Sequence, residues 1–125
     1  MKTMYHLSVK NILPQIMSEG INIDKKDILP RIYLTDDRQW ILKMAEFFTG
    51  LNKDIQEDNI IFIELDISEI MIYPDDMPAD LLPEHWEQSV KDEYPQHCFF
   101  TSENIPVTRI IKVYDIKGND LAASH

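Results

Sequence analysis

The sequence predicts an α+β fold in a single domain, and three observations lead to that class. Short stretches in which apolar and polar residues alternate, as in strands, are interleaved with stretches whose apolar residues recur every three or four positions, as in helices. The chain has 125 residues, of which 44% are hydrophobic and 27% charged, and this is enough apolar material for one ordinary core. It contains only three glycines and no repeat or Gly/Ser linker, so residues 1–125 are expected to form one domain with short connections.

The first half of the chain predicts two units, each a strand followed by a helix. Residues 4–7 form a short apolar and aromatic run, and the apolar residues at positions 9, 12, 13, 16 and 17 mark one face of a helix. Gly20 suits the position just past the end of that helix. Residues 31–35 are expected to form the second strand. Asp36, with Gln39 three positions later, resembles a capping box at the start of a second helix that reaches position 50.

The second half predicts a central strand, a segment rich in turns, one helix and two closing strands. Ile61, Ile63, Leu65 and Ile67 alternate with their neighbours at a period of two, which is typical of a half-buried strand. Prolines at positions 74, 78 and 83 interrupt the segment that follows. The remaining expected elements are a short strand at 70–73, a helix at 84–94 and strands at 97–101 and 107–116.

Charge and hydropathy bear on the classes of partner. Acidic residues number 22 against 12 basic ones, so the net charge is -10, and nucleic acid is disfavoured as a partner by long-range repulsion. The longest unbroken run of aliphatic and aromatic residues is 60–63, far shorter than the ~20 residues of a membrane-spanning helix. Residues 1–10 lack the apolar stretch of a signal peptide. We therefore expect no membrane partner and a cytoplasmic location.

Several common kinds of chemical site are excluded by the sequence. A single cysteine, Cys98, allows neither an intramolecular disulfide nor a thiolate-rich metal site. The chain has no glycine-rich phosphate loop, no His-Glu-x-x-His helix and no nucleophile elbow. The histidines, at positions 6, 85, 97 and 125, are too scattered to suggest a shared metal ion, so no metal site is predicted.

One region carries most of the negative charge. Between positions 64 and 93 there are ten acidic residues and a single basic one, Lys91. The structural interpretation is a solvated helix and loop face, and the functional interpretation is a docking surface for a basic partner. The acidic positions are 64, 66, 69, 75, 76, 80, 84, 87, 92 and 93.

The most specific pattern lies in the first 37 residues. Residues 5–8 are Tyr-His-Leu-Ser, residues 18–21 are Ser-Glu-Gly-Ile, and residues 32–37 are Ile-Tyr-Leu-Thr-Asp-Asp. Their order resembles the ADP-ribosyltransferase superfamily, in which an aromatic-His strand, a short helix ending in a Glu-Gly turn and a Tyr-x-Ser/Thr strand follow one another. The resemblance implies two small packed antiparallel or mixed sheets with flanking helices, and NAD as the substrate.

The same resemblance implies roles for individual residues. His6 matches the histidine that holds the ribose hydroxyl next to nicotinamide, and Tyr33 matches the aromatic residue that stacks on the nicotinamide ring. The residues implied to bind NAD are His6, Leu7, Ser8, Tyr33 and Thr35. The RNA 2'-phosphotransferases of that superfamily grip phosphate with arginines that have no counterparts after His6, which disfavours that activity.

The third catalytic position is where the sequence departs from the family. Residues 96–101 and 105–113 resemble the last strands of the superfamily, and this alignment puts Gln96 where the family has a catalytic glutamate. A shift by one residue would put His97 there, and Glu103 is a nearby carboxylate that could substitute. A carboxylate stabilises positive charge as the nicotinamide bond breaks, whereas a neutral amide only forms hydrogen bonds. The implied catalytic residues are thus His6, Tyr33 and either Gln96, His97 or Glu103.

Three functions follow as hypotheses. The first is transfer of ADP-ribose from NAD to a protein or small-molecule acceptor. The second is a catalytically degenerate module of the same fold that docks a basic partner through the acidic 64–93 region. The third is an unrelated acidic α+β protein that blocks a nucleic-acid-binding partner. The first two require the side chains of His6 and Tyr33 in one cleft.

Each of these residues also has a purely structural interpretation. His6 is compatible with a buried, hydrogen-bonded core histidine, and Tyr33 with an ordinary strand aromatic. The Thr-Asp-Asp run at 35–37 is compatible with a helix cap. Trp40 and Trp86 are candidates for an interface between copies if either is exposed.

Overall fold

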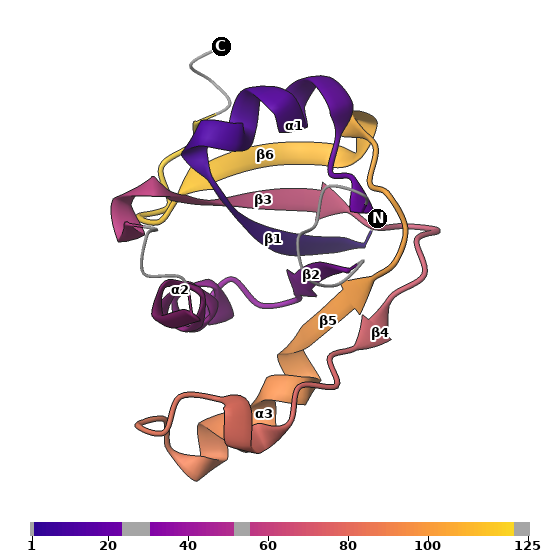
Figure 1. The fold of residues 1–125 in the computed structure, drawn as a ribbon. Helices are drawn as coiled ribbons and strands as arrows, with labels where there is room; N and C mark the ends of the chain where they lie inside the picture. Colours follow the sequence, from indigo (N-terminus) through magenta and orange to yellow (C-terminus); the bar gives the residue numbers. More distant parts are fainter. Residues whose placement is uncertain (1, 24–30, 52–55, 122–125) are drawn as a thin grey trace.

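The computed structural model describes residues 2–23, 31–51 and 56–121 of the chain. It contains both strands and helices, as the sequence predicts for an α+β fold, and Figure 1 shows their arrangement. The strands are β1 (Thr3–Val9), β2 (Ile32–Thr35), β3 (Ile60–Asp66), β4 (Tyr73–Pro74), β5 (Cys98–Thr101) and β6 (Ile110–Asp115). The α-helices are α1 (Leu13–Glu19), α2 (Trp40–Leu51) and α3 (Gln88–His97).

All six strands belong to one antiparallel sheet with the order β4-β5-β2-β1-β3-β6. The two packed sheets implied by the resemblance are not found in the described part of the chain. The reason is that β1 pairs on both of its edges, with β3 along its whole length and with β2 at Tyr5 and Thr35. That second pairing joins two three-stranded halves, β6-β3-β1 and β2-β5-β4, into one continuous sheet.

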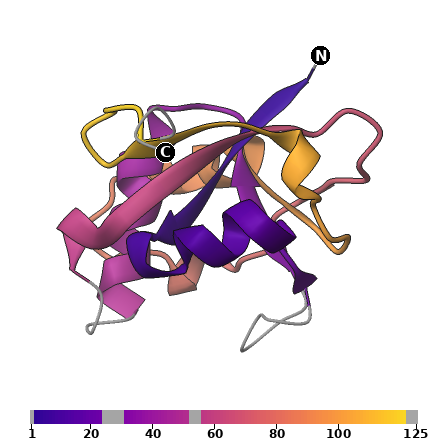
Figure 2. The same cartoon turned by 90° about the horizontal axis from the view of Figure 1, so that it is seen from above.

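One face of the sheet packs on α1 and forms the main core. Met4 of β1, Leu34 of β2 and Ile63 of β3 meet Ile16 of α1 there, and all four side chains are buried. In Figure 2, which looks from above, α1 runs beside β1. The side chains on this face alternate in sequence with those on the other, so β1 presents residues 4, 6 and 8 to the α1 side.

A second core lies away from α1, between α2, α3 and the segment before α3. Trp40 and Trp86 meet edge to face there, with ring centroids 6.1 Å apart, and Tyr94 and Cys98 pack beside them. Both tryptophans are buried, so neither serves as the exposed interface residue that the sequence left open. This second core holds α3 at the lower end of the molecule in Figure 1.

Several elements differ from the sequence prediction in their bounds, including the last strand, which was expected at 107–116 and is confined to β6 after a 3-10 turn at Val107–Arg109. β1 continues to Val9 and a 3-10 turn (Lys10–Ile12) follows, so the first helix begins only at Leu13 with Pro14 in its first turn. The predicted strand at 70–73 is reduced to the two residues of β4. The last helix begins at Gln88, because residues 83–86 form a turn that directs Trp86 into the second core.

In residues 2–23, 31–51 and 56–121, no helix combines the length and the apolar character needed to cross a bilayer.

Candidate functional site

The side chains of His6 and Tyr33 lie on opposite faces of the sheet. His6 follows Met4 on the α1 face and is 4% exposed, whereas Tyr33 alternates with Ile32 and Leu34, which are both in the core under α1. The register of β1 against β2 leads to the same conclusion. Tyr5 pairs with Thr35, so in this antiparallel pair Leu7, and not His6, lies beside Tyr33. The two side chains therefore do not line one cleft.

The ring of His6 nevertheless contacts the backbone of Tyr33. Its ring Nδ1 is 2.7 Å from the carbonyl oxygen of Tyr33, and because a carbonyl only accepts, Nδ1 is the donor. The bond spans the β1–β2 junction, where backbone pairing is limited to Tyr5 and Thr35. His6 thus helps to join the two halves of the sheet.

A row of aromatic side chains crosses the face opposite α1. Each of the six strands contributes one residue at the same level of the sheet, and five of the six are aromatic. From one edge of the sheet to the other they are Tyr114, Phe62, Leu7, Tyr33, Phe100 and Tyr73. We call this set the aromatic row. With strands about 4.8 Å apart it extends over roughly 24 Å, long enough to underlie a dinucleotide.

Neighbouring rings in the aromatic row contact one another. Phe62 and Tyr114 are stacked with centroids 4.9 Å apart, and Tyr33 and Phe100 lie 6.4 Å apart. Tyr73 continues the row, 5.4 Å from Phe100, and is 43% exposed at the edge of the sheet. Tyr33, Phe100 and Tyr114 are half-buried. Phe62 is buried at 4% exposure, so the row is open at Tyr73 and only in part at Tyr33, Phe100 and Tyr114.

Two arginines flank the aromatic row on the same face. The guanidinium of Arg31 lies 4.0 Å from the centre of the Phe100 ring, and that of Arg38 lies 4.7 Å from the Tyr114 ring. Arg31 also binds the carboxylate of Asp76 through two N–H groups, at 2.8 and 3.3 Å, which raises the pKa of Arg31. Within the described residues no carboxylate pairs with Arg38, which is exposed. Arg38 is the better placed of the two to receive an anion.

A carboxylate lies in the next row of the same face. Glu64 is directly opposite Tyr5, which in turn is opposite Thr35. The hydroxyl of Tyr114 donates to Glu64 at 3.2 Å. Burial, and then the charge of Glu64, raise the pKa of both Tyr5 and Tyr114, so both phenols are neutral donors at neutral pH.

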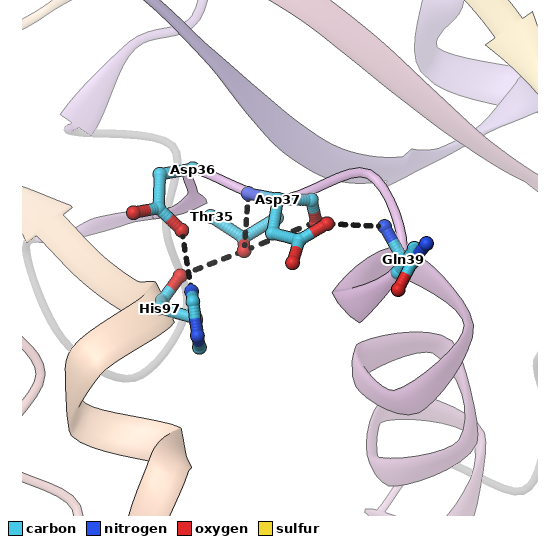
Figure 3. A network of polar contacts seen from close by, with 5 residues as sticks. All are labelled: Thr35, Asp36, Asp37, Gln39 and His97. Carbon is cyan, nitrogen blue, oxygen red and sulfur yellow. Dashed lines mark hydrogen bonds and ion pairs between the residues drawn. The ribbon is translucent and has the colours of Figure 1, made fainter.

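The end of β2 is tied to the end of α3 by a network of polar contacts (Figure 3). The Thr35 hydroxyl donates to the His97 carbonyl at 2.7 Å, and His97 Nδ1 donates to the Asp36 carboxylate at 3.0 Å. The His97 ring is also stacked on Trp40 at 5.7 Å. His97 is thereby oriented by contacts on its Nδ1 and on one face of its ring.

The same network corrects the predicted capping box. The carboxylate that accepts a hydrogen bond at the start of α2 belongs to Asp37, which binds the backbone N–H of Gln39 at 2.9 Å (Figure 3). Asp36 is instead turned toward His97. The predicted capping box at Asp36 is therefore wrong: the carboxylate that accepts a backbone hydrogen bond just before α2 is that of Asp37, one position later.

The predicted site residues thus separate into three groups. Leu7, Tyr33 and Thr35 share the face that carries the aromatic row, whereas His6 and Ser8 point toward α1. The remaining two are exposed and lie elsewhere: Gln96 is on α3, and Glu103 accepts a hydrogen bond from the Met71 backbone in the loop after β5.

Among the candidates for the third catalytic position, only His97 contacts one of the predicted NAD-binding residues, through its carbonyl and Thr35. The sequence reasoning gave no site role to Tyr5, Glu64 or Tyr114, which lie on the same face as Tyr33. Strict alternation along β1 was the available signal, since it separates Tyr5 and Leu7 from His6.

The acidic 64–93 region does not form one surface. Asp75 is buried and accepts a hydrogen bond from Tyr94 at 2.6 Å, and Asp76 is paired with Arg31. Asp66 lies 3.5 Å from Arg109. The exposed acidic residues around α3 are Asp80, Glu84, Glu87, Asp92 and Glu93.

The site offers planar stacking surfaces, one exposed guanidinium, neutral phenols and a carboxylate. It offers no metal centre in the part of the chain that the structure describes, where no three His, Cys, Asp or Glu side chains are grouped to hold an ion. No protein-family model matches the chain, and no curated protein sequence is similar to it.

Proposed function

We propose that this chain binds a nucleotide on the aromatic row and that the nucleotide is NAD. The observation that carries the proposal is the row itself, with Tyr33 near its middle and an exposed arginine on its flank. A nicotinamide or adenine ring gains from stacking on aromatic side chains, and a diphosphate gains from a guanidinium. Because His6 lies on the opposite face of the sheet, the resemblance to ADP-ribosyltransferases supports NAD here only through residues 32–37, in which Tyr33 would stack on the nicotinamide ring, and the expected location is the cytoplasm.

Transfer of ADP-ribose to a protein or small-molecule acceptor is the reaction that the proposal implies. The acceptor attacks the ribose carbon C1′ while the bond from C1′ to the nicotinamide nitrogen breaks, and nicotinamide leaves with the bonding electrons. Glu64 would stabilise the positive charge that develops on the ribose, and His97, oriented by Asp36, would take the proton of the acceptor. In this assignment Glu64 replaces Gln96 and Glu103, and His6 supports the sheet.

The alternative function, docking of a basic partner, is supported by the exposed acidic residues around α3. Five of them lie close together in the sequence between positions 80 and 93. A basic peptide such as hexa-arginine would bind there with an affinity that falls steeply with salt. If NAD and this peptide bind without competing, the two functions use separate surfaces and are compatible with each other.

Calorimetric titration of the protein with NAD and with ADP-ribose tests the main proposal. We expect saturable NAD binding that weakens about fivefold in Tyr33→Ala, equivalent to about 1 kcal/mol of lost stacking, and that also weakens in Arg38→Ala. Leu81→Ala, which shortens an exposed side chain before α3, serves as the control and is expected to bind like the unaltered protein. Equal affinity for NAD in the Tyr33 variant would refute the site.

A further inference from the structure

A cavity lies on the face of the sheet opposite the aromatic row, between β1 and α1. It has a volume of about 130 Å³ and opens to solvent. Its wall includes three isoleucines, from α1 and the turns at both of its ends, and two amide side chains. The side chains that matter for its chemistry are Ser8, Ile12, Gln15, Ile16, Ile21 and Asn22.

The polar group inside this cavity is the hydroxyl of Ser8. Ser8 is 6% exposed, and the alternation of β1 points its side chain toward α1, where the cavity lies. In the described residues no group of the protein hydrogen-bonds this hydroxyl. Among the described residues, Ser8 is not one whose polar atom is fully enclosed and unpaired, so its hydroxyl is reached from the cavity and can exchange a water for a polar group of a ligand.

The lining determines the class of ligand. None of the lining residues carries a charge, so the cavity would desolvate an ion without compensating it. Three isoleucines favour an apolar body, and Ile12 is a large apolar side chain that is 38% exposed at the entrance. The volume accommodates a single six-membered ring with a short substituent.

We propose that this cavity is a binding site for a small neutral molecule with one ring and one hydroxyl or carbonyl group, which bonds Ser8. The site is separate from the aromatic row, since Ser8 and Tyr33 lie on opposite faces of the sheet. Its ligand is therefore expected to bind whether or not a nucleotide binds on the other face.

Nuclear magnetic resonance titration with two small probes tests this proposal. Benzyl alcohol has the ring and a hydroxyl, and toluene has the ring alone. With the unaltered full chain, we expect benzyl alcohol to shift the amide resonances of Ser8, Ile16 and Ile21 saturably at millimolar concentration. Ser8→Ala should weaken benzyl alcohol by about three- to tenfold and leave toluene unchanged.

If Ser8→Ala alters the fold, a second variant still tests the proposal. Ile12→Trp adds a larger ring at the half-exposed entrance and should block both probes while leaving the spectrum of the sheet intact. Benzyl alcohol that shifts none of the three amides, or that binds Ser8→Ala as tightly as the unaltered chain, would overturn the proposal. Shifts confined to Tyr33 and Phe100 would overturn it as well.

Discussion

His6 and Tyr33 are joined by a hydrogen bond of 2.7 Å, yet their side chains lie on opposite faces of the sheet. The bond runs from the His6 ring to the Tyr33 backbone, so it depends on the identity of residue 6 and not on that of residue 33. The sequence pattern pairs these two residues most strongly. The hydrogen bond between them contributes to the stability of the sheet, but their side chains cannot contact the same ligand.

Substitution of these two residues should separate stability from binding. His6→Ala removes a buried ring and the bond across the β1–β2 junction, and should lower the free energy of unfolding by about 2 kcal/mol. Tyr33→Ala should affect NAD affinity more than stability. Urea unfolding and calorimetric titration of both variants check this. Loss of NAD binding in a folded His6→Ala protein would show that His6 is part of the NAD-binding site.

Glu64→Gln should separate binding from catalysis. The amide keeps the shape of the side chain but removes the charge that would stabilise the developing oxocarbenium ion. We expect NAD affinity to stay within about twofold, and nicotinamide release to fall by roughly a hundredfold. Release measured by chromatography provides the readout, with Gln96→Ala as the matched control. A larger loss in the Gln96 variant would transfer the catalytic role to α3.

Asp76→Asn should strengthen nucleotide binding. Asp76 neutralises Arg31 through two hydrogen bonds, and its removal leaves the Arg31 charge beside the aromatic row available to a phosphate. The pKa of Asp76 is lowered by Arg31, so the pair is fully formed above the ordinary carboxyl range and is lost only as the pH falls through the lowered value. At pH 7 and low salt we expect NAD affinity to rise on the order of threefold. Affinity that is unchanged or weaker would show that the phosphates do not approach Arg31.

Gly20→Ala should destabilise the fold more than Gly118→Ala. Both glycines have positive φ, but a Cβ on Gly20 would lie 2.4 Å from the carbonyl oxygen of Ile105, whereas a Cβ on Gly118 would meet only the flexible side chain of Arg38 at 3.6 Å. We expect a loss of about 3 kcal/mol for Gly20→Ala and about 1 kcal/mol for Gly118→Ala. Thermal unfolding of the two variants in parallel gives the comparison, and equal losses would contradict it.

Alkaline pH should destabilise the protein through the second core. Burial raises the pKa of Cys98 and of Tyr94, and the charge of Asp75 adds to both. The folded protein therefore keeps the thiol protonated while the unfolded chain ionises it near pH 9.0, so stability is full below that value and falls as the pH rises. Between pH 9 and 10 the fall should approach about 1.4 kcal/mol per pH unit.

Cys98→Ala provides the control for the alkaline transition. This variant lacks the thiol, so its stability should change less between pH 9 and 10, as measured by urea unfolding at each pH. The Cys98 side chain is 1% exposed, and a thiol reagent should accordingly label it only after unfolding. Rapid labelling of the folded protein would contradict the burial on which this prediction depends.

The local pattern of the sequence was sufficient to predict the α+β class, the strand around Ile63, the two strand–helix units at the start of the chain and the glycine turn at Gly20. These features depend on alternation, helical spacing and backbone freedom, which act between residues a few positions apart. The bounds of α3 and the capping residue of α2 were not predictable in this way. Trp86 is drawn into a core formed with Trp40, and Asp36 is drawn to His97, each across more than 40 positions of the chain.

The candidate site was decided almost wholly by tertiary structure. The sequence by itself named Tyr33, Leu7 and Thr35 as candidate NAD-binding residues. It grouped them with His6 and Ser8, because His6 and Ser8 are the neighbours of Leu7 along the chain. Pairing across six strands brought Tyr33 instead into one row with Phe62, Phe100 and Tyr114. The physical reason is that successive side chains of a strand point to opposite faces, so a functional surface on a sheet is assembled across strands by their register and not along one strand by sequence.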